Sequence, residues 1–328
     1  TLFAVHHEYF PLGGFVSQNF DSLSAWGKAK DLVWHSILPL VCYMVGSFAF
    51  MTMLMKNSLM ENLSPDNAVA QLEQEIKYLE ELERVQARAA KVAAIVNGGV
   101  FPGMSNIMAG LLCERGPAQR LSFSYFIAGS GGSGPAVMAS TFLLGTRPAS
   151  EFVRGEWVGR QAFTGGVATE FLAPVGRRTC YSLELPETTS CYEIYKIPNI
   201  SARFATSPGV WNHATRWTCT LLKPWLSHRQ RVTSFVTLLL PLIRVIDRFV
   251  GAAIAMDVAV ESADGQIQRL RYVHESTMES IAQAVTAQAE ELLLGRVSAG
   301  VHFPEEAISD KERHLQRAAV GGVLLPGS

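Results

Sequence analysis

The stretch LSFSYFIAGSGGSGPAVMASTFLLG, residues 121–145, predicts a strand, a glycine-rich turn and a helix in direct succession. Phe123, Tyr125 and Ile127 alternate along residues 122–128 with the two-residue period of a β-strand. Four glycines then turn the chain, and Pro135 suits the first position of a helix because proline lacks the N–H that is unpaired there. Backbone N–H groups at such a helix start can hold an anion.

The glycine loop has two interpretations. Gly129, Gly131 and Gly134 match the G-x-G-x-x-G spacing of dinucleotide-binding loops, and with Gly132 they are the candidate cofactor-binding residues. A complete nucleotide-binding unit has a second strand that ends in an acidic residue about 20 positions later. Here the nearest acid, Glu151, precedes a strand-like run. A tight strand-to-helix turn that lines a pocket is therefore favoured over dinucleotide binding.

Composition narrows the class of protein. The 328 residues have room for one large or two ordinary domains, and their net charge of −1 gives no electrostatic case for binding nucleic acid. Five widely spaced cysteines without a C-x-x-C pair indicate reduced thiols in an intracellular setting. The histidines show no spacing typical of metal ligands, so no metal site is expected.

The N-terminal region differs from the rest of the chain. LPLVCYMVGSFAFMTMLM, residues 38–55, contains no charge and just reaches the length of a membrane-spanning helix, although a helix buried in a soluble core is the alternative. Residues 65–90 combine an apolar stripe at three-four spacing with a charged face. This pattern predicts an amphipathic surface helix, so residues 64–86 are interpreted as a connector.

The order of short motifs in residues 5–63 carries a resemblance. FPLGG (10–14), the segment 19–28, WHSILPL (34–40) and VGSFAFMTMLMKNSLMENL (45–63) resemble an inner-membrane permease of the ABC importer family for oligopeptides. In that family the segment comprises an extracytoplasmic loop, one transmembrane helix and the start of a cytoplasmic stretch. The coupling loop that docks the ATPase does not follow residue 63, so the resemblance does not imply a working permease.

From residue 87 onward, strand and helix patterns alternate. They predict an α/β fold, with α+β as the alternative, built on a mixed sheet with flanking helices and without a complete Rossmann domain. The strands are expected at residues 92–96, 122–128, 152–158 (a hairpin about Arg154-Gly155), 178–185, 200–206, 254–260 and 266–273 (a hairpin about Asp264-Gly265). The helices are expected at residues 107–113 (capped by Ser105 or Asn106), 136–144, 233–250, 276–294 (capped by Ser276 with Glu279) and 310–319.

Eight separated motifs in this region carry a second resemblance. They are GGVFPGMSN (98–106), SYFIAGSGGSGP (124–135), FLLG (142–145), APVGRR (173–178), LPE (185–187), SARFATSPGVWN (201–212), the segment 247–251 and GVHFPEE (300–306). In this order they resemble the non-cofactor domain of the saccharopine dehydrogenase-like family, over residues 87–321. The resemblance implies a domain that supplies the substrate side and dimer contacts, for hydride transfer between NAD or NADP and an amine-bearing carbon of an amino-acid conjugate.

One departure from that family bears on activity. Its cofactor is bound by a separate N-terminal Rossmann domain, whereas here the permease-like segment precedes residue 87. The chain is therefore expected to be a catalytically incomplete substrate domain within a fused or rearranged gene.

The motifs supply the candidate site residues. Tyr125 and His213 are the catalytic candidates, since a tyrosine can donate a proton and a histidine titrates near neutral pH. Candidate substrate-binding residues are Ser105, Asn106, Arg203 and Asn212. The alternatives are a core position for Tyr125 and, for Arg203, an ion pair with a structural acid such as Glu305.

Three functions remain open at this point. The leading hypothesis is the substrate domain of a saccharopine dehydrogenase-like oxidoreductase; the others are a membrane transport component and a non-enzymatic interaction module. The expected partners are a small amino-acid-like substrate and a second copy of the chain, with membrane contact through residues 38–55 and no nucleic acid. The expected location is a cytoplasmic domain that is free or anchored by the N-terminal helix.

Overall fold

The computed structural model describes residues 87–327 apart from 133, 227 and 228, together with a few positions between residues 17 and 32. The chain divides into two compact units, Thr1–Val92 and Ala93–Ser328. In the first, Asp31 accepts a hydrogen bond of 2.8 Å from the backbone N–H of Ser17. The span expected at residues 38–55 and the connector at residues 64–86 lie outside the described residues. No helix in the described part of the chain is long and apolar enough to cross a membrane.

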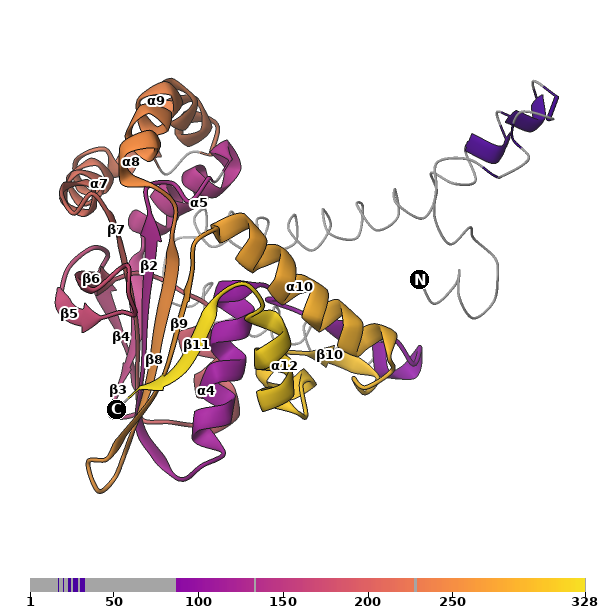
Figure 1. Ribbon diagram of the computed structural model, residues 1–328. Helices are drawn as coiled ribbons and strands as arrows, with labels where there is room; N and C mark the ends of the chain where they lie inside the picture. Colours follow the sequence, from indigo (N-terminus) through magenta and orange to yellow (C-terminus); the bar gives the residue numbers. More distant parts are fainter. Residues whose placement is uncertain are drawn as a thin grey trace, which may run out of the picture. The chain divides into compact units, whose positions relative to one another are not determined.

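The second unit is built on a nine-stranded mixed sheet (Figure 1). Its main path runs β11 (Val323–Gly327), β9 (Ile267–His274), β8 (Ile254–Ser262), β2 (Ala118–Ala128), β7 (Asn199–Ser207), β3 (Pro148–Val153) and β4 (Glu156–Gln161). β6 (Arg177–Ser182) pairs with β7 and with β5 (Val167–Glu170). β2 and β7 are parallel to each other, and β1 (Ala93–Ile95) pairs in parallel with β10 (Gly300–His302) in a separate two-stranded sheet.

β2 is buried on both faces. Phe123 and Tyr125 are fully buried in the main apolar core, whereas Phe126 and Ala128 contribute to a second core across the sheet. Successive side chains of a strand point to opposite faces, so the apolar stretch that predicts this strand fills both cores. Burying one phenylalanine side chain stabilises the fold by about 1.5–3 kcal/mol.

Helices pack in two groups. α4 (Ser105–Cys113), α10 (Thr277–Leu293) and α12 (Lys311–Ala318) pack together beside the sheet (Figure 1). α4 also contacts α6 (Glu187–Tyr195) and α11 (Pro304–Ala307). The other group comprises α5 (Pro135–Gly145), α7 (Val210–Leu221), α8 (Lys223–Leu226) and α9 (Arg229–Val250). We call this second group the helical cap. It has its own apolar core, which includes Met138, Phe142, Val236 and Ile243.

Most of the sequence-based elements are confirmed. The mixed sheet with flanking helices is present, and both hairpins turn at the expected residues, Arg154-Gly155 and Asp264-Gly265. The hydroxyl of Ser276 caps α10 by accepting a hydrogen bond of 3.3 Å from the Glu279 N–H. Pro135 occupies the first turn of α5.

One predicted cap is wrong. Ser105 and Asn106 were expected to cap the helix that follows them, but α4 begins at Ser105 and its N-cap is Met104. The Ser105 hydroxyl instead donates to Glu187, and the Asn106 side-chain oxygen accepts from the N–H of Gly103 within the preceding loop. Buried polar partners, which the local sequence does not show, redirect both side chains.

Candidate functional site

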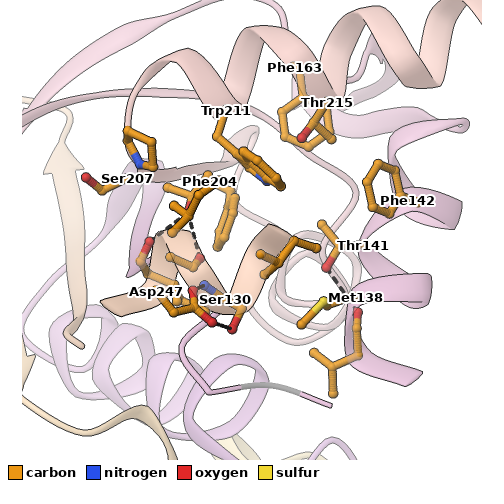
Figure 2. A pocket seen from close by; sticks show the side chains of 17 residues that line it. Ser130, Met138, Thr141, Phe142, Phe163, Phe204, Ser207, Trp211, Thr215 and Asp247 are labelled. Atoms are coloured by element: carbon orange, nitrogen blue, oxygen red, sulfur yellow. Dashed lines mark hydrogen bonds between the residues drawn. The ribbon is translucent and has the colours of Figure 1, made fainter. Parts of the chain in front are cut away.

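A pocket lies where β2 and β7 end, beneath the helical cap. Because β2 and β7 are parallel, their carboxyl ends lie together, which is where ligands bind in open α/β sheets. Each strand passes there into the turn before a cap helix, α5 after β2 and α7 after β7. The pocket is lined by Ile127, Gly129, Ser130, Val137, Met138, Thr141, Phe142, Phe163, Phe204, Thr206, Ser207, Pro208, Trp211, Thr215, Ile243, Ile246 and Asp247 (Figure 2).

Asp247 makes the polar corner of the pocket. Its carboxylate accepts a hydrogen bond of 2.8 Å from the Ser130 backbone N–H and one of 2.6 Å from the Ser130 hydroxyl, both drawn from the glycine loop (Figure 2). The guanidinium of Arg244 lies 3.4 Å from the same carboxylate. The acid is therefore held in place by the loop and by its own helix, α9.

The rest of the pocket is mostly apolar. Aromatic and aliphatic side chains from the sheet and from three cap helices face the same space, among them Phe204, Trp211 and Met138 (Figure 2). Asp247 is the single charged residue of the lining. A concave apolar site with few polar groups is typical of small-molecule binding. This lining suits a ligand with an apolar body and a hydrogen-bond donor or cation that reaches Asp247.

The glycine loop leaves little room for a pyrophosphate. Gly129 has φ +57°, and a side-chain carbon added to it collides with the Asp247 carboxylate. The Ser130 N–H, which could face a phosphate, already donates to that carboxylate. Moreover, β3 follows α5 but runs antiparallel to β7 and thus to β2, so the loop does not open a parallel βαβ unit. These contacts do not support a dinucleotide here, and cofactor binding by Gly129, Gly131, Gly132 and Gly134 stays a sequence-based prediction.

A second group of polar residues is buried in the core, away from the pocket lining. The Glu187 carboxylate accepts hydrogen bonds from the Tyr125 hydroxyl at 2.8 Å and from the Ser105 hydroxyl at 3.1 Å. The Asn106 amide donates to Glu305 and to Ser190, both at 2.9 Å. We call this group the buried carboxylate cluster: Ser105, Asn106, Tyr125, Glu187, Ser190, Cys191 and Glu305.

Burial dominates the electrostatics of this cluster. It raises the pKa of Glu187 and the pKa of Glu305, although hydrogen bonds from Tyr125, Ser105 and Asn106 oppose the rise. One oxygen of each carboxylate has no hydrogen-bond partner. Burial also raises the pKa of Tyr125 well above its ordinary value, so this tyrosine is fully protonated at neutral pH. The cluster therefore favours protonated acids in the folded state.

Arg203 pairs with a structural acid, the alternative to a substrate role. One guanidinium nitrogen lies 3.5 Å from the Glu151 carboxylate, and another donates to the Ser201 hydroxyl at 2.7 Å. The acid is Glu151, whereas Glu305 belongs to the buried carboxylate cluster. Arg203 is not part of the pocket lining.

Asn212 and His213 lie at a neighbouring basic cleft. This cleft is lined by Arg177, Arg178, Thr179, Tyr181, Ala205, Thr206, Gly209, Val210, Asn212 and His213, and it shares Thr206 with the pocket. The Asn212 side chain is buried and bonds both the N–H and the carbonyl of Thr206 at 3.0 Å, so it fixes the end of β7. His213 is 3.3 Å from the Tyr181 hydroxyl. Cationic side chains at this cleft can bind a carboxylate.

The structure thus separates the sequence-predicted site residues. Ser105, Asn106 and Tyr125 share the buried carboxylate cluster, and Asn212 and His213 share the basic cleft. Gly129 is the one predicted residue that lines the pocket, and Arg203 lies apart from all three places, beside Glu151. Their catalytic and binding roles stay predictions. Asp247 falls within the motif 247–251 but is not named as a site residue from the sequence, although it is the single acid of residues 207–251 and that isolation is a usable signal.

The described histidine, cysteine and acidic side chains form neither a metal site nor a disulfide at the pocket. Among the described residues, no three histidine, cysteine or acidic side chains gather as a metal site. Cys113, Cys180, Cys191 and Cys219 are free thiols. Burial raises the pKa of Cys219 to about 12 and that of Cys180 to about 11, so these thiols are poor nucleophiles.

Comparison with known proteins returns both resemblances found in the sequence. No family model matches the chain. Its N-terminal part is similar to the peptidoglycan transport system permease protein YejB of Agrobacterium fabrum, with 34% identity over 96 residues, 29% of this chain and 26% of that protein. The inner membrane ABC transporter permease protein YejB of Escherichia coli O157:H7 is 45% identical over 58 residues, 18% of this chain and 16% of that protein. The chain thus spans about a quarter and about a sixth of these two relatives.

A solved structure is similar to most of the chain. It is the apo saccharopine dehydrogenase (L-Glu forming) of Saccharomyces cerevisiae, with a TM-score of 0.44, 12% sequence identity, and coverage of 81% of this chain and 78% of that one. A likeness at this TM-score does not assign a function.

The first prediction concerns the loop at the polar corner. Gly129→Ala is expected to lower the free energy of unfolding by about 1–3 kcal/mol, because alanine is strained at φ +57° and its side chain meets Asp247. Gly134→Ala is the matched control: that glycine is extended, with open space around it, and its loss should cost less than about 1 kcal/mol. Urea unfolding of both variants measures the difference; equal costs contradict the assigned role of Gly129.

The second prediction concerns the buried carboxylate cluster. Glu187 has a folded pKa above its ordinary 4.5, so the folded state binds more protons than the unfolded state once the pH exceeds that value. Its contribution to stability is therefore complete below pH 4.5 and falls as the pH rises toward the folded pKa.

Glu187→Gln removes this titration. The free energy of unfolding, measured by urea unfolding between about pH 5 and 8, should decline less steeply with pH in Glu187→Gln than in the wild type. The exposed Glu193→Gln, on the same helix, serves as the control and should keep the wild-type slope. Identical slopes for Glu187→Gln and the wild type contradict the raised pKa.

Proposed function

We propose that residues 87–327 form the substrate-binding domain of an oxidoreductase of the saccharopine dehydrogenase type. The observation that supports this proposal is the position, in the folded domain, of the motifs that resemble the saccharopine dehydrogenase-like family. SYFIAGSGGSGP, SARFATSPGVWN and the segment 247–251 are far apart in the sequence, yet each contributes residues to the pocket. Their convergence on one apolar pocket at the carboxyl ends of parallel strands supports a common role in binding.

Three other motifs meet in the core. GGVFPGMSN supplies Ser105 and Asn106 to the buried carboxylate cluster, LPE supplies Glu187, and GVHFPEE supplies Glu305. Tyr125 belongs to β2, which ends at the pocket, and its hydroxyl bonds Glu187. The cluster therefore fixes the strand that carries the glycine loop, which is a supporting role for the site.

The pocket limits the class of substrate. Hydride transfer at an amine-bearing carbon, the reaction of the family, requires an amine, and Asp247 is an acid that can pair with its cationic form. Several carboxylates do not fit a pocket whose single charged group is itself an acid. A carboxylate of an amino-acid-like substrate has suitable partners in the basic cleft, at Arg177 and Arg178. The substrate is thus an amine with an apolar body and one acidic end.

The hydride for such a reaction comes from a nicotinamide cofactor and not from a side chain of the pocket. The resemblance implies NAD or NADP, but the contacts of the glycine loop do not support a pyrophosphate there. No catalytic step is assigned to this chain. Its own residues bind and orient: Asp247 and Ser130 at the polar corner, and the aromatic lining around the apolar body.

The N-terminal part supports a second candidate function. Its similarity to the YejB permeases favours a membrane-inserted fragment of a transport protein, with residues 38–55 as the span. The two functions concern different parts of the chain and do not compete for the same residues.

The third prediction tests the pocket. Thr141 lines it and bonds the carbonyl one turn earlier in α5, and Thr237 makes the same bond in α9 but lies exposed outside the lining. Thr141→Trp should fill the pocket and weaken binding of N-octyl-L-alanine, an amine with an apolar body and one carboxylate, by about tenfold or more, measured by calorimetry, while Thr237→Trp should leave it unchanged. Saccharopine, with three carboxylates, is the discriminating comparison and should bind more weakly.

Two results contradict the proposal. One is an equal effect of the two tryptophan variants, which places binding outside the pocket. The other is no binding of N-octyl-L-alanine to the wild-type chain, which removes the substrate class. Addition of NADPH and NADH with nicotinamide fluorescence in the same titration reports whether the glycine loop binds a dinucleotide.

The fourth prediction tests the span. A charge at the centre of a membrane helix costs about 2.5–3.5 kcal/mol, so Gly46→Arg should release the chain from bacterial membranes extracted with alkaline carbonate. Ser58→Arg, just beyond the apolar run, is the control and should stay in the membrane pellet. Release of the wild-type chain by carbonate contradicts an inserted span.

A further inference from the structure

Helix α9 exposes an apolar stripe to solvent. Leu238, Leu242, Val245 and Phe249 follow each other at spacings of four, three and four residues, which places them on one face of the helix. Leu238 is 78% exposed and Phe249 is 86% exposed. A different face of α9, with Val232, Val236 and Ile243, packs into the cap core. The helix thus has enough apolar residues for its core and a further set that the domain does not cover.

Exposed apolar residues continue on the other cap helices. Trp225 of α8 is 40% exposed, and its ring lies 6.0 Å from the ring of Phe235, one turn before Leu238 on α9. Val210, Trp217 and Leu221 form an exposed stripe on α7, which contacts α8. We call the exposed residues Trp225, Leu238, Leu242, Val245 and Phe249 the cap patch. Contiguous apolar surface of this kind marks an interaction site in most proteins.

The cap is also basic. Residues 207–251, which carry its helices α7, α8 and α9, contain Arg216, Lys223, Arg229, Arg231, Arg244 and Arg248, against the single acid Asp247. Three of these cations stand within two residues of an exposed aromatic ring: Arg216 by Trp217, Lys223 by Trp225 and Arg248 by Phe249. This contrasts with the net charge of −1 of the whole chain. The positive charge is therefore concentrated where the apolar residues are exposed.

This combination fits one kind of partner. A helix lies in a membrane interface when one face carries Leu, Phe and Trp and the flanking positions carry Lys and Arg. Tryptophan favours this boundary because its ring is amphipathic, and long basic side chains reach the headgroups from it. Each cation near an anionic lipid surface adds to the attraction.

We propose that the helical cap docks on an anionic lipid bilayer through the cap patch. The pocket adjoins this surface: Ile246 lines it and lies one turn from Leu242 and Phe249, and Val137 lines it while being 55% exposed. A docked domain therefore presents an apolar pocket next to the acyl layer. The docking itself rests on the exposed surface and stands independently of the proposed function.

The fifth prediction measures this docking by sedimentation with vesicles. All chains carry Gly46→Arg, so that the apolar run at residues 38–55 does not itself insert. The vesicles consist of phosphatidylcholine alone or of phosphatidylcholine with phosphatidylglycerol. The parent chain should bind the anionic vesicles more tightly by about tenfold or more, and added salt should weaken the binding.

Substitutions then locate the contact. The variant Leu238→Ser, Leu242→Ser and Phe249→Ser should lose about tenfold or more of the vesicle binding. The control Leu293→Ser with Leu294→Ser changes two leucines at the end of α10 that are exposed to about the same extent as Leu242, and it should bind like the parent. Circular dichroism confirms that each variant is folded. In addition, brominated lipid should quench tryptophan emission in the parent chain and less so in Trp225→Phe.

Three outcomes overturn the proposal. The first is equal binding of the triple serine variant and the parent chain. The second is equal affinity for neutral and anionic vesicles. The third is a parent chain that dimerises without binding vesicles and becomes monomeric in the triple serine variant, because a second copy then covers the cap patch. Failure of substrate binding at the pocket, by contrast, leaves these results unchanged.

Discussion

The parallel pairing of β2 with β7 is the constraint on which the site depends. Nine consecutive residue pairs, from Arg120 with Asn199 to Ala128 with Ser207, bring the carboxyl ends of two strands together although about 80 residues separate them in the chain. The turns after these strands then start α5 and α7 side by side, and the side chain of Thr206 closes the junction by bonding the carbonyls of Ile127 and Gly129 at 2.9 Å. The pocket is a consequence of this pairing rather than of any single loop.

Polar groups buried near β2 explain why this strand is held so firmly. Tyr125 bonds Glu187 of α6, and Asn106 of α4 bonds Glu305 of α11, so two helices from different parts of the chain are tied to α4 and β2. A buried polar group without a partner is costly, whereas a bonded one fixes the geometry of its neighbours. Each of the two acids keeps one oxygen without a hydrogen-bond partner, and burial raises the pKa of both.

Local sequence patterns predicted the elements that depend on neighbouring residues: strands, tight turns and helix starts. The alternation of Phe123, Tyr125 and Ile127 gave the strand, Asp264-Gly265 gave the hairpin, and Ser276 with Glu279 gave the start of α10. The same reasoning missed α6, because its buried positions are polar and contribute no apolar period: Glu187, Thr188 and Ser190. It also gave Ser105 and Asn106 as caps, and it named Glu305 instead of Glu151 as the acid that could pair with Arg203, since the partners of these side chains lie far away in the sequence. The pocket could be placed from the glycine loop, but Asp247, 117 residues beyond Ser130, could not.

Helix α9 combines tasks that are usually divided among several elements. One face carries Val236 and Ile243 into the cap core, Asp247 reaches the glycine loop, and Leu238 and Phe249 remain exposed. At 3.6 residues per turn, Ile246 at the pocket lies between the core face and the exposed stripe and borders the stripe, one turn from Leu242 and from Phe249. An exposed apolar stripe offers the isolated domain no burial energy, so its presence beside the pocket indicates that the surface has a partner. Because arginine and lysine are dense around this stripe, the matching partner carries negative charge. Because tryptophan side chains are exposed there, the partner also has an apolar interior that these rings can reach.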